Sequence, residues 1–191
     1  RKTRRVGAEK CARCMAAVSR RMDHCGPGAL DRAPADLNGL LHKTHALLAK
    51  QLDECAVQVA FDLDSALPPV PVVANQIQQV FFNLIINAME AMPDGGTLHI
   101  RSHVSQADDA PPQVVMAFTD DGAGIAPGDA PSVFEPFYTT KDKGSGLGLS
   151  VSYGILTAHG GALELLPADG RGACFRVLLP LESITAIEES S

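Results

Sequence analysis

The stretch ANQIQQVFFNLIINAMEAM, residues 74–92, is the most informative about the fold of this 191-residue chain. Its apolar residues recur at steps of three and four, as they do on a helix that packs one face on a core. A second set at the same spacing is polar, so the expected helix also carries a continuous polar face. The apolar stripe consists of Ile77, Val80, Phe81, Leu84, Ile85 and Ala88, and the polar face of Gln76, Gln79, Asn83, Asn87 and Glu90.

The two asparagines are the unusual feature of this polar face. A solvated face is the plain alternative, but asparagine is a poor helix former, and Lys, Glu or Arg would serve a solvated face better. Asn83 and Asn87 lie one helical turn apart, so their amide oxygens can point at the same small volume. A neutral amide oxygen suits a Mg²⁺ ion that keeps several waters and bridges nucleotide phosphates. We therefore expect a ligand at this face.

Strand and helix patterns alternate along the rest of the chain. Residues 57–63, 98–104 and 114–119 have strand patterns, and residues 162–166 and 173–179 predict a hairpin. Residues 37–53, capped by Asp36, and residues 147–159 have helical periods, and prolines between residues 68 and 71 predict a stiff connection. This order predicts a layered α/β fold. The buried stripe of helix 37–53 is expected to hold Leu37, Leu40, Leu41, Leu47, Leu48 and Leu52.

The segment TDDGAGI, residues 119–125, follows an apolar strand. An ordinary Asp-Gly turn is one interpretation. However, Asp120 stands where a side chain leaving a buried strand can face a cavity, and Gly122 and Gly124 allow another group to approach the backbone closely. A carboxylate at this place can accept a hydrogen bond from the exocyclic amine of adenine. It would reject guanine, which has a carbonyl oxygen at that position.

A third segment, VFEPFYTTKDKGSGLGLS at residues 133–150, combines aromatic residues, lysines and regularly spaced glycines. It matches neither the P-loop, which ends in Gly-Lys-Ser/Thr, nor the dinucleotide pattern Gly-x-Gly-x-x-Gly. Lys141 can neutralise phosphate oxygens, and Gly144, Gly146 and Gly148 lead into a helical pattern. The N-terminus of such a helix favours anions.

Taken in order, NLIINA, DDGAGI, FEPFYTTK and GSGLGL resemble the N, G1, F and G2 boxes of sensor histidine kinases. These boxes define their catalytic, ATP-binding domain, within the gyrase, Hsp90, histidine kinase and MutL superfamily. The sequences of these motifs are most similar to those of the nitrogen-regulation and oxygen-sensing kinases. The resemblance covers residues 36–180. It implies a two-layer α/β sandwich, the Bergerat fold, in which a mixed sheet backs one layer of helices. ATP would lie between the helices and a lid.

The resemblance also implies a role for each matching residue. Asn87 would coordinate Mg²⁺, Asn83 would assist around the phosphates, and Asp120 would bind the adenine amine. Asn83 and Lys141 are the expected catalytic residues. The expected nucleotide-binding set is Asn83, Asn87, Asp120, Gly122, Gly124, Ile125, Lys141, Gly144, Gly146, Leu147 and Gly148.

The same resemblance predicts three parts and a function. Residues 1–30 would be the end of the dimerisation and phosphoacceptor helix pair with its linker, residues 31–181 the ATP-binding catalytic domain, and residues 182–191 a flexible tail. The domain would transfer the γ-phosphoryl group of ATP to a histidine on a dimerisation helix not present in this chain. A response regulator aspartate would then receive it. The parent protein is expected to be a homodimer.

Two other functions stay open at this point. One is a degenerate module that senses ATP or docks a partner without catalysis. The other is an ATPase of the same superfamily. Those ATPases resemble this chain but carry a glutamate as general base where Asn83 stands. An amide cannot take a proton from water, so Asn83 disfavours strong hydrolysis.

Composition limits the remaining classes. The formal net charge of −6 argues against a dedicated nucleic-acid binder. Apolar runs are far shorter than the roughly 20 residues that a membrane span needs. An odd number of cysteines, 5, favours a reducing compartment, and we expect a cytoplasmic domain whose parent protein can be anchored upstream. Cys11 and Cys14 lack the second ligand pair of a zinc site and are interpreted as apolar helix residues.

Overall fold

The computed structural model describes residues 31–106, 111–139, 145–166 and 172–181. The chain divides into two units, Arg1–Asp31 and Arg32–Ser191, and the elements below belong to the second. The predicted helix remnant in residues 1–30 and the predicted tail 182–191 lie outside the described residues. In the part that the structure describes, no helix is both long and apolar enough to cross a membrane.

A five-stranded mixed sheet forms one layer, in the order β2-β4-β5-β7-β6. Strand β2 runs parallel to β4, and each remaining neighbouring pair is antiparallel. A parallel pair needs a long crossover, and here it passes through α3. The bounds are β2 Val57–Leu63, β4 Gly96–Ser105, β5 Gln113–Asp120, β6 Ala162–Leu166 and β7 Cys174–Pro180. The predicted strands and the predicted hairpin of β6 and β7 are confirmed.

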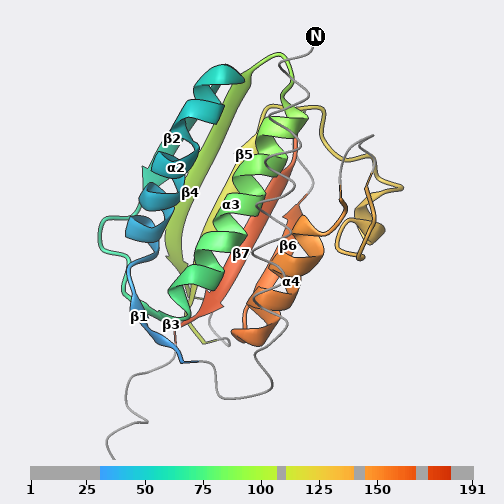
Figure 1. Ribbon diagram of the computed structural model, residues 1–191. Helices are drawn as coiled ribbons and strands as arrows, with labels where there is room; N and C mark the ends of the chain where they lie inside the picture. Colours follow the sequence, from blue (N-terminus) through green and yellow to red (C-terminus); the bar gives the residue numbers. More distant parts are fainter. Residues whose placement is uncertain (1–30, 107–110, 140–144, 167–171, 182–191) are drawn as a thin grey trace, which may run out of the picture. The chain divides into compact units, whose positions relative to one another are not determined.

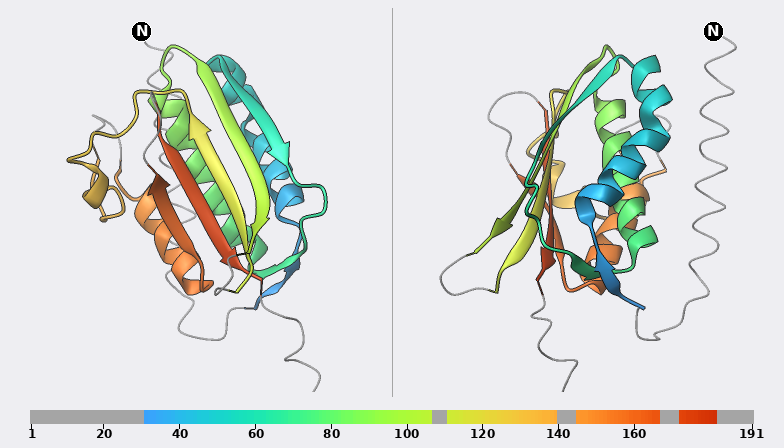
Figure 2. Two further views of the ribbon diagram at one scale, coloured as in Figure 1. Left: turned by 180° about the vertical axis from the view of Figure 1, so that it is seen from behind. Right: turned by 90° about the vertical axis from the view of Figure 1, so that its left-hand side faces the viewer.

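Three helices form the second layer, all on one face of the sheet (Figures 1 and 2). They are α2 Leu37–Glu54, α3 Ala74–Ala91 and α4 Gly148–Ala158. Helix α3 occupies the middle position and contacts α2, α4 and β5. The predicted two-layer α/β sandwich is therefore confirmed, and the helix with the polar face lies at its centre.

The core lies between α3 and the sheet. The rings of Phe81 on α3 and Phe118 on β5 have centroids 5.8 Å apart. Burying one large apolar side chain contributes about 1.5–3 kcal/mol, so this layer dominates the stability of the sandwich. The largest fully buried side chains are Leu37, Leu41, Leu48, Ile77, Phe81, Leu84, Ile85, Leu98, Ile100, Met116, Phe118 and Leu156.

Helix α2 begins as predicted, because the Asp36 side chain accepts a hydrogen bond from the Gly39 amide at 3.0 Å. The expected burial of Leu47 is wrong, since 76% of this residue is exposed. At about 100° per residue, Leu47 lies roughly 90° around the helix axis from the centre of the buried stripe. The spacing of three and four residues placed Leu47 in the apolar stripe, but the sheet does not reach that side of α2.

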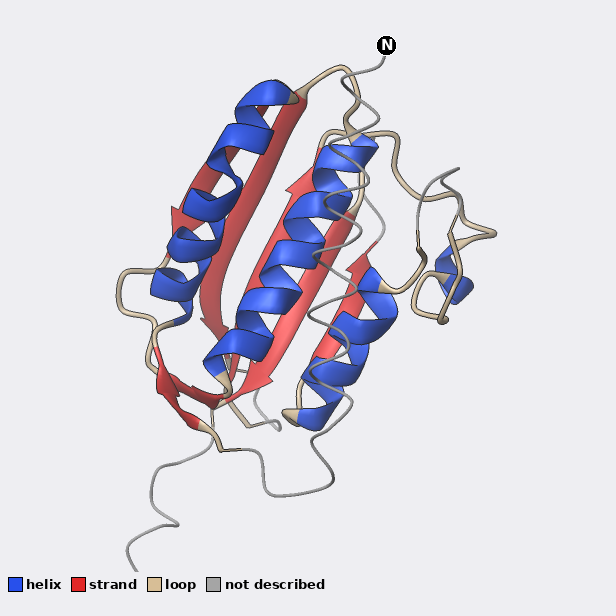
Figure 3. Ribbon diagram, viewed as in Figure 1, coloured by secondary structure: helices blue, strands red, loops and turns tan. Residues whose placement is uncertain are grey.

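A small second sheet was not predicted. Strands β1, Ala33–Ala35, and β3, Val70–Val72, pair antiparallel with Pro34 opposite Pro71 (Figure 3). Proline lacks the amide donor of a strand, so its presence argues against strand formation. The predicted stiff connection is thus also a short strand, and it leads directly into α3.

Candidate functional site

Asn83 joins the central helix to the start of α4. Its side chain is buried, and its Nδ2 donates hydrogen bonds to the carbonyl oxygen of Gly148 and to Ser152 Oγ, both at 3.0 Å. A carbonyl oxygen can only accept, so the nitrogen of the amide must face α4. The Oδ1 atom stays near the helix start, 4.0 Å from where a Cβ atom on Gly148 would lie.

Asn87 lies one turn further along α3 and is half-buried. Its Nδ2 is buried and has no hydrogen-bond partner among the described residues. Leaving such a group unpaired costs about 1–3 kcal/mol, and nearly all buried polar groups in native proteins have a partner. The unpaired Nδ2 of Asn87 thus indicates that a group outside the described residues accepts a hydrogen bond from it.

Asp120 ends β5 on the same side of the sheet as the helices, because it is paired with the buried Leu98. It is only 4% exposed. Its Oδ1 accepts hydrogen bonds from the amides of Gly122, at 2.9 Å, and Ala173, at 3.4 Å. The carboxylate is thereby held in a fixed orientation between the end of β5 and the start of β7.

Two glycines let the backbone close around Asp120. A Cβ atom on Gly122 would lie 2.6 Å from the carbonyl oxygen of Ala91, the last residue of α3. Gly172 has a φ of +93°, and a Cβ atom there would lie 1.7 Å from the Asp120 carbonyl oxygen. The loop after β5 is therefore pressed against both the C-terminus of α3 and the segment that enters β7.

The aromatic segment is attached to this frame at several points. The Phe134 ring lies beside Tyr153 and Phe175, with centroids 5.6 and 6.4 Å away. The Tyr138 hydroxyl donates to Asp129 Oδ1 at 2.7 Å, and this hydrogen bond raises the pKa of Tyr138. The Phe137 amide donates to the Gly146 carbonyl at 3.0 Å, which ties this segment to the glycine-rich stretch.

The structure brings most of the predicted site residues to one end of the helix layer. Asn83 contacts Gly148 directly, and Gly122 packs on the last turn of the helix that carries Asn87. Gly146 and Leu147 immediately precede α4, whose first residue is Gly148. Gly124 and half-buried Ile125 follow the Asp120 turn. Lys141 and Gly144 lie outside the described residues.

Two buried polar residues of α4 and its C-cap were not among the predicted site residues, Ser152 near the start of the helix and His159 at its other end. Ser152 is fully buried and accepts from Asn83, as described above. His159 is 2% exposed and accepts a hydrogen bond from the Val73 amide through Nε2 at 3.0 Å. A polar residue inside an apolar helical run was the available signal for Ser152. Its partner is 69 residues away in the sequence, beyond the reach of any local pattern.

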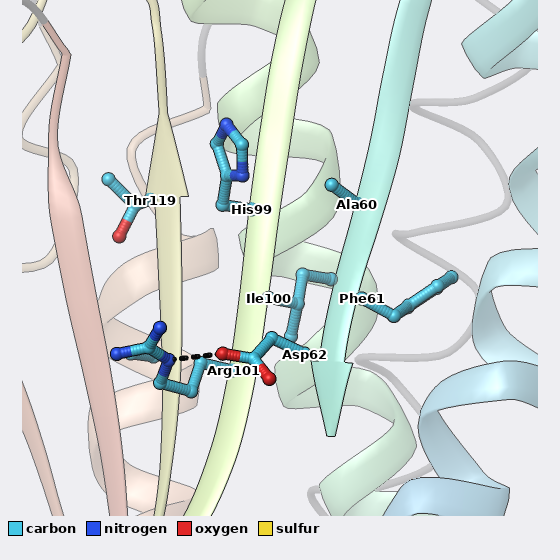
Figure 4. A pocket seen from close by; sticks show the side chains of 8 residues that line it. Ala60, Phe61, Asp62, His99, Ile100, Arg101 and Thr119 are labelled. Carbon is cyan, nitrogen blue, oxygen red and sulfur yellow. Dashed lines mark hydrogen bonds and ion pairs between the residues drawn. The ribbon is translucent and has the colours of Figure 1, made fainter.

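A shallow pocket of about 360 Å³ lies on the open side of the sheet, away from this site (Figure 4). His99, Arg101 and Thr119 contribute to its lining, together with Asp62. Arg101 and Asp62 form an ion pair at 2.7 Å, and both side chains are largely exposed. Exposed pairs contribute at most about 1 kcal/mol. This pocket has no connection with the asparagines.

The donor set at the asparagines fits a hard cation rather than a transition metal. The described residues contain no group of three or more His, Cys, Asp and Glu side chains that could hold a metal ion. Zinc and its relatives favour such ligands, whereas amide and phosphate oxygens suit Mg²⁺. Asn83 contacts the start of α4, and Asn87 follows one turn later on α3. Their amide oxygens are of the type that suits Mg²⁺, and the unpaired Nδ2 of Asn87 suits a phosphate oxygen.

Residues 72–183 match the family model described as histidine kinase-, DNA gyrase B- and HSP90-like ATPase. The chain belongs to this family. Members similar to it include Sporulation kinase E of Bacillus subtilis, 35% identical over 81% of this chain and 20% of the relative. The sensor histidine kinase ZraS of Salmonella typhimurium is 31% identical over 92% of this chain and 37% of its own length. The chain thus spans well under half of these relatives.

A solved member of the family shares the fold. Full-length ShkA in complex with AMPPNP superimposes with a TM-score of 0.70 and 28% identity, over 82% of this chain and 32% of that structure. With the family match, this likeness confirms the prediction of a histidine kinase-like ATP-binding fold. The AMPPNP is bound by ShkA.

Proposed function

We propose that this chain is the ATP-binding catalytic domain of a sensor histidine kinase. It transfers the γ-phosphoryl group of ATP to a histidine on a dimerisation helix, for relay to a response regulator aspartate. The observation that carries the proposal is the buried Nδ2 of Asn87, which has no partner among the described residues and lies one helical turn from Asn83. Its N–H groups suit an anion such as a phosphate oxygen, and its Oδ1 is the atom that could face a cation. Membership of the ATPase family supports it further.

The amide side chains of Asn87 and Asn83 would hold Mg²⁺ and the phosphates. The cation supplies charge that offsets the negative charge of the triphosphate. Because Asn83 Nδ2 is bound to α4, its Oδ1 is the atom that it can offer to the ligand. The amides of Gly146, Leu147 and Gly148, at the N-terminus of α4, favour phosphate oxygens. Lys141 would neutralise the transferring group.

Asp120 would select the base. Its Oδ1 is oriented by main-chain amides, so the carboxylate needs little reorganisation when adenine arrives. An acceptor at this place pairs with the amine of adenine and repels the carbonyl oxygen of guanine. Gly122, Gly124 and Ile125 would shape the surrounding pocket.

Transfer is favoured over hydrolysis by the chemistry of Asn83. An ATPase of this superfamily needs a general base at that position, and an amide whose nitrogen faces α4 cannot accept a proton from water. Catalysis would then rest on positioning and charge rather than on a base that activates water. A degenerate module would bind ATP, or nothing, without transfer.

The rest of the assignment follows from the similarity to sensor kinases. Residues 1–30 would be the end of the dimerisation and phosphoacceptor helices, residues 31–181 the catalytic domain, and residues 182–191 a flexible tail. The partners would be those helices and a receiver domain, within a cytoplasmic part of a homodimer.

Isothermal titration tests the proposal first. ATP is titrated into the chain with Mg²⁺, and GTP serves as the control. Saturable binding of ATP alone is expected. Labelled ATP is then mixed with the chain and an added phosphoacceptor helix pair, and label on that helix pair is expected. Binding without transfer would favour the degenerate module, and rapid phosphate release would favour the ATPase.

A further inference from the structure

Three groups at the junction of α3 and α4 form a closed set of hydrogen bonds: the buried side chains of Asn83 and Ser152 and the carbonyl of half-buried Gly148. Ser152 Oγ donates to the Gly148 carbonyl at 2.8 Å. Asn83 Nδ2 donates to the same carbonyl and to Ser152 Oγ, both at 3.0 Å. The Gly148 carbonyl can only accept, so Ser152 Oγ donates to it and accepts from Asn83 Nδ2. The nitrogen of the amide is thereby held at the start of α4.

We propose that Ser152 is a positioning residue for nucleotide binding, which acts through Asn83. The inference rests on the proposed function and goes beyond it by adding a residue outside the four boxes. Two acceptors hold Nδ2 of the Asn83 amide and so fix its orientation, which leaves Oδ1 as the atom that it can offer to a ligand. Without the hydroxyl, the Gly148 carbonyl is the one remaining described acceptor of Nδ2, and the amide is oriented less firmly.

Helix stability alone gives no reason for serine at this position. Ser152 is fully buried, and a serine that bonds the carbonyl four residues earlier slightly destabilises a helix. Alanine is the better helix former. The hydroxyl is useful because it also accepts from the buried Nδ2 of Asn83. Its role is therefore tied to Asn83.

The same contact connects the glycine-rich stretch to the metal-binding helix. Gly148 is both the last glycine of that stretch and the first residue of α4. Its carbonyl accepts from both side chains, so a shift of this backbone changes the position of the acceptors that orient Asn83. Ser150 offers a matched contrast, because its hydroxyl donates to the Leu147 carbonyl at 3.0 Å on the same helix.

The test compares Ser152→Ala with Ser150→Ala by titration of ATP, with Mg²⁺ and with a chelator. Ser152→Ala is expected to raise the Kd of ATP roughly five- to thirtyfold in Mg²⁺, as for one lost orienting hydrogen bond. With chelator, its Kd should stay within about twofold of the unaltered chain. Ser150→Ala should bind as the unaltered chain does in both conditions. Thermal melting without nucleotide confirms that the variants are folded.

A double-mutant cycle shows whether Ser152 acts through Asn83. In an Asn83→Ala background, Ser152→Ala should change the Kd by less than about twofold. The positioning role would be overturned if Ser152→Ala raised the Kd of ATP by the same factor in the Asn83→Ala background as in the unaltered chain. It would also be overturned if the Kd rose equally with chelator. Unchanged binding by Ser152→Ala, in a chain that binds ATP, overturns this inference alone. Failure of the unaltered chain to bind ATP would instead overturn the proposed function, and this inference with it.

Discussion

The imidazole of His159 accepts a hydrogen bond from the main-chain amide of Val73, 86 residues earlier in the sequence. Its other ring nitrogen, Nδ1, lies 2.8 Å from the Ile155 carbonyl and donates to it. Val73 is the N-cap residue of α3 and contributes no side-chain cap. The ring thus connects the C-terminus of α4 to the N-terminus of the helix that carries both asparagines.

Replacing this ring should cost stability. His159→Ala leaves the half-buried Val73 amide without its acceptor, and we expect a loss of about 1–3 kcal/mol in the free energy of unfolding. Urea denaturation measures it. His103→Ala, at an exposed position of β4, is the control and should change the free energy by less than about 0.5 kcal/mol. Equal effects would show that the His159 bonds carry no stability.

Asn87→Ala should separate binding from folding. The side chain has no partner for Nδ2 among the described residues, so its removal should leave the unfolding free energy of the nucleotide-free chain unchanged or slightly higher. ATP binding in Mg²⁺ should fall at least roughly tenfold, as for a lost charge-assisted contact. Titration and urea denaturation give the two values. Asn75→Ala, exposed on the same helix, controls for the substitution, and unaltered binding by Asn87→Ala would contradict the metal assignment.

Asp120→Asn should change base selectivity while the turn is retained. The new amide oxygen can still accept from the Gly122 amide, but its NH₂ group would face the adenine amine, and two donors repel. The Kd of ATP should rise roughly tenfold to a hundredfold, whereas GTP should not lose affinity. Asp121→Asn is the control, because it removes the same charge at the adjacent residue, whose carboxylate accepts a hydrogen bond from the Thr97 amide. It should leave ATP binding within about twofold, and a similar loss there would indicate a general charge effect.

Gly172→Ala should be severely destabilising, because the added Cβ would meet the Asp120 carbonyl at 1.7 Å and the residue has a φ of +93°. Both the backbone strain and the collision act on the turn that holds the carboxylate. We expect a loss of more than about 3 kcal/mol, or failure to fold. Gly128→Ala, where a Cβ meets nothing within 4 Å, should fold normally. Circular dichroism and urea melts decide between these outcomes.

Tyr138 should lose its proton at a higher pH than an ordinary tyrosine. Its pKa is raised above 10.0, chiefly by the hydrogen bond to Asp129. A raised pKa in the folded state means that the contribution to stability is complete below pH 10 and is lost as the pH rises through the folded value. Ultraviolet titration in a Tyr153→Phe background, which leaves one of the 2 tyrosines, measures the midpoint. Asp129→Ala should lower it, and an unchanged midpoint would contradict this cause.

Local patterns predicted the elements, and long-range contacts account for what they missed. Helix α3 was expected over residues 74–92 and spans Ala74–Ala91, since its apolar stripe has the helical period and packs as such. The pairing of β1 with β3, the solvent exposure of Leu47 and the partners of Asn83 depend on segments far apart in the sequence. No period or motif carries that information. The residues of the boxes were predictable, but the serine and histidine that support them were not.

The close approach of the backbone at Gly122 and Gly172 affects how relatives of this chain should be interpreted. A side chain at either position would collide with the protein's own main chain, whether or not a nucleotide ever binds. A descendant that had lost phosphoryl transfer would therefore keep these glycines for as long as it folded. The presence of these glycines therefore indicates common descent and the same fold, and not phosphoryl transfer. Loss of activity should instead show first at Asn87, whose Nδ2 has no hydrogen-bond partner among the described residues.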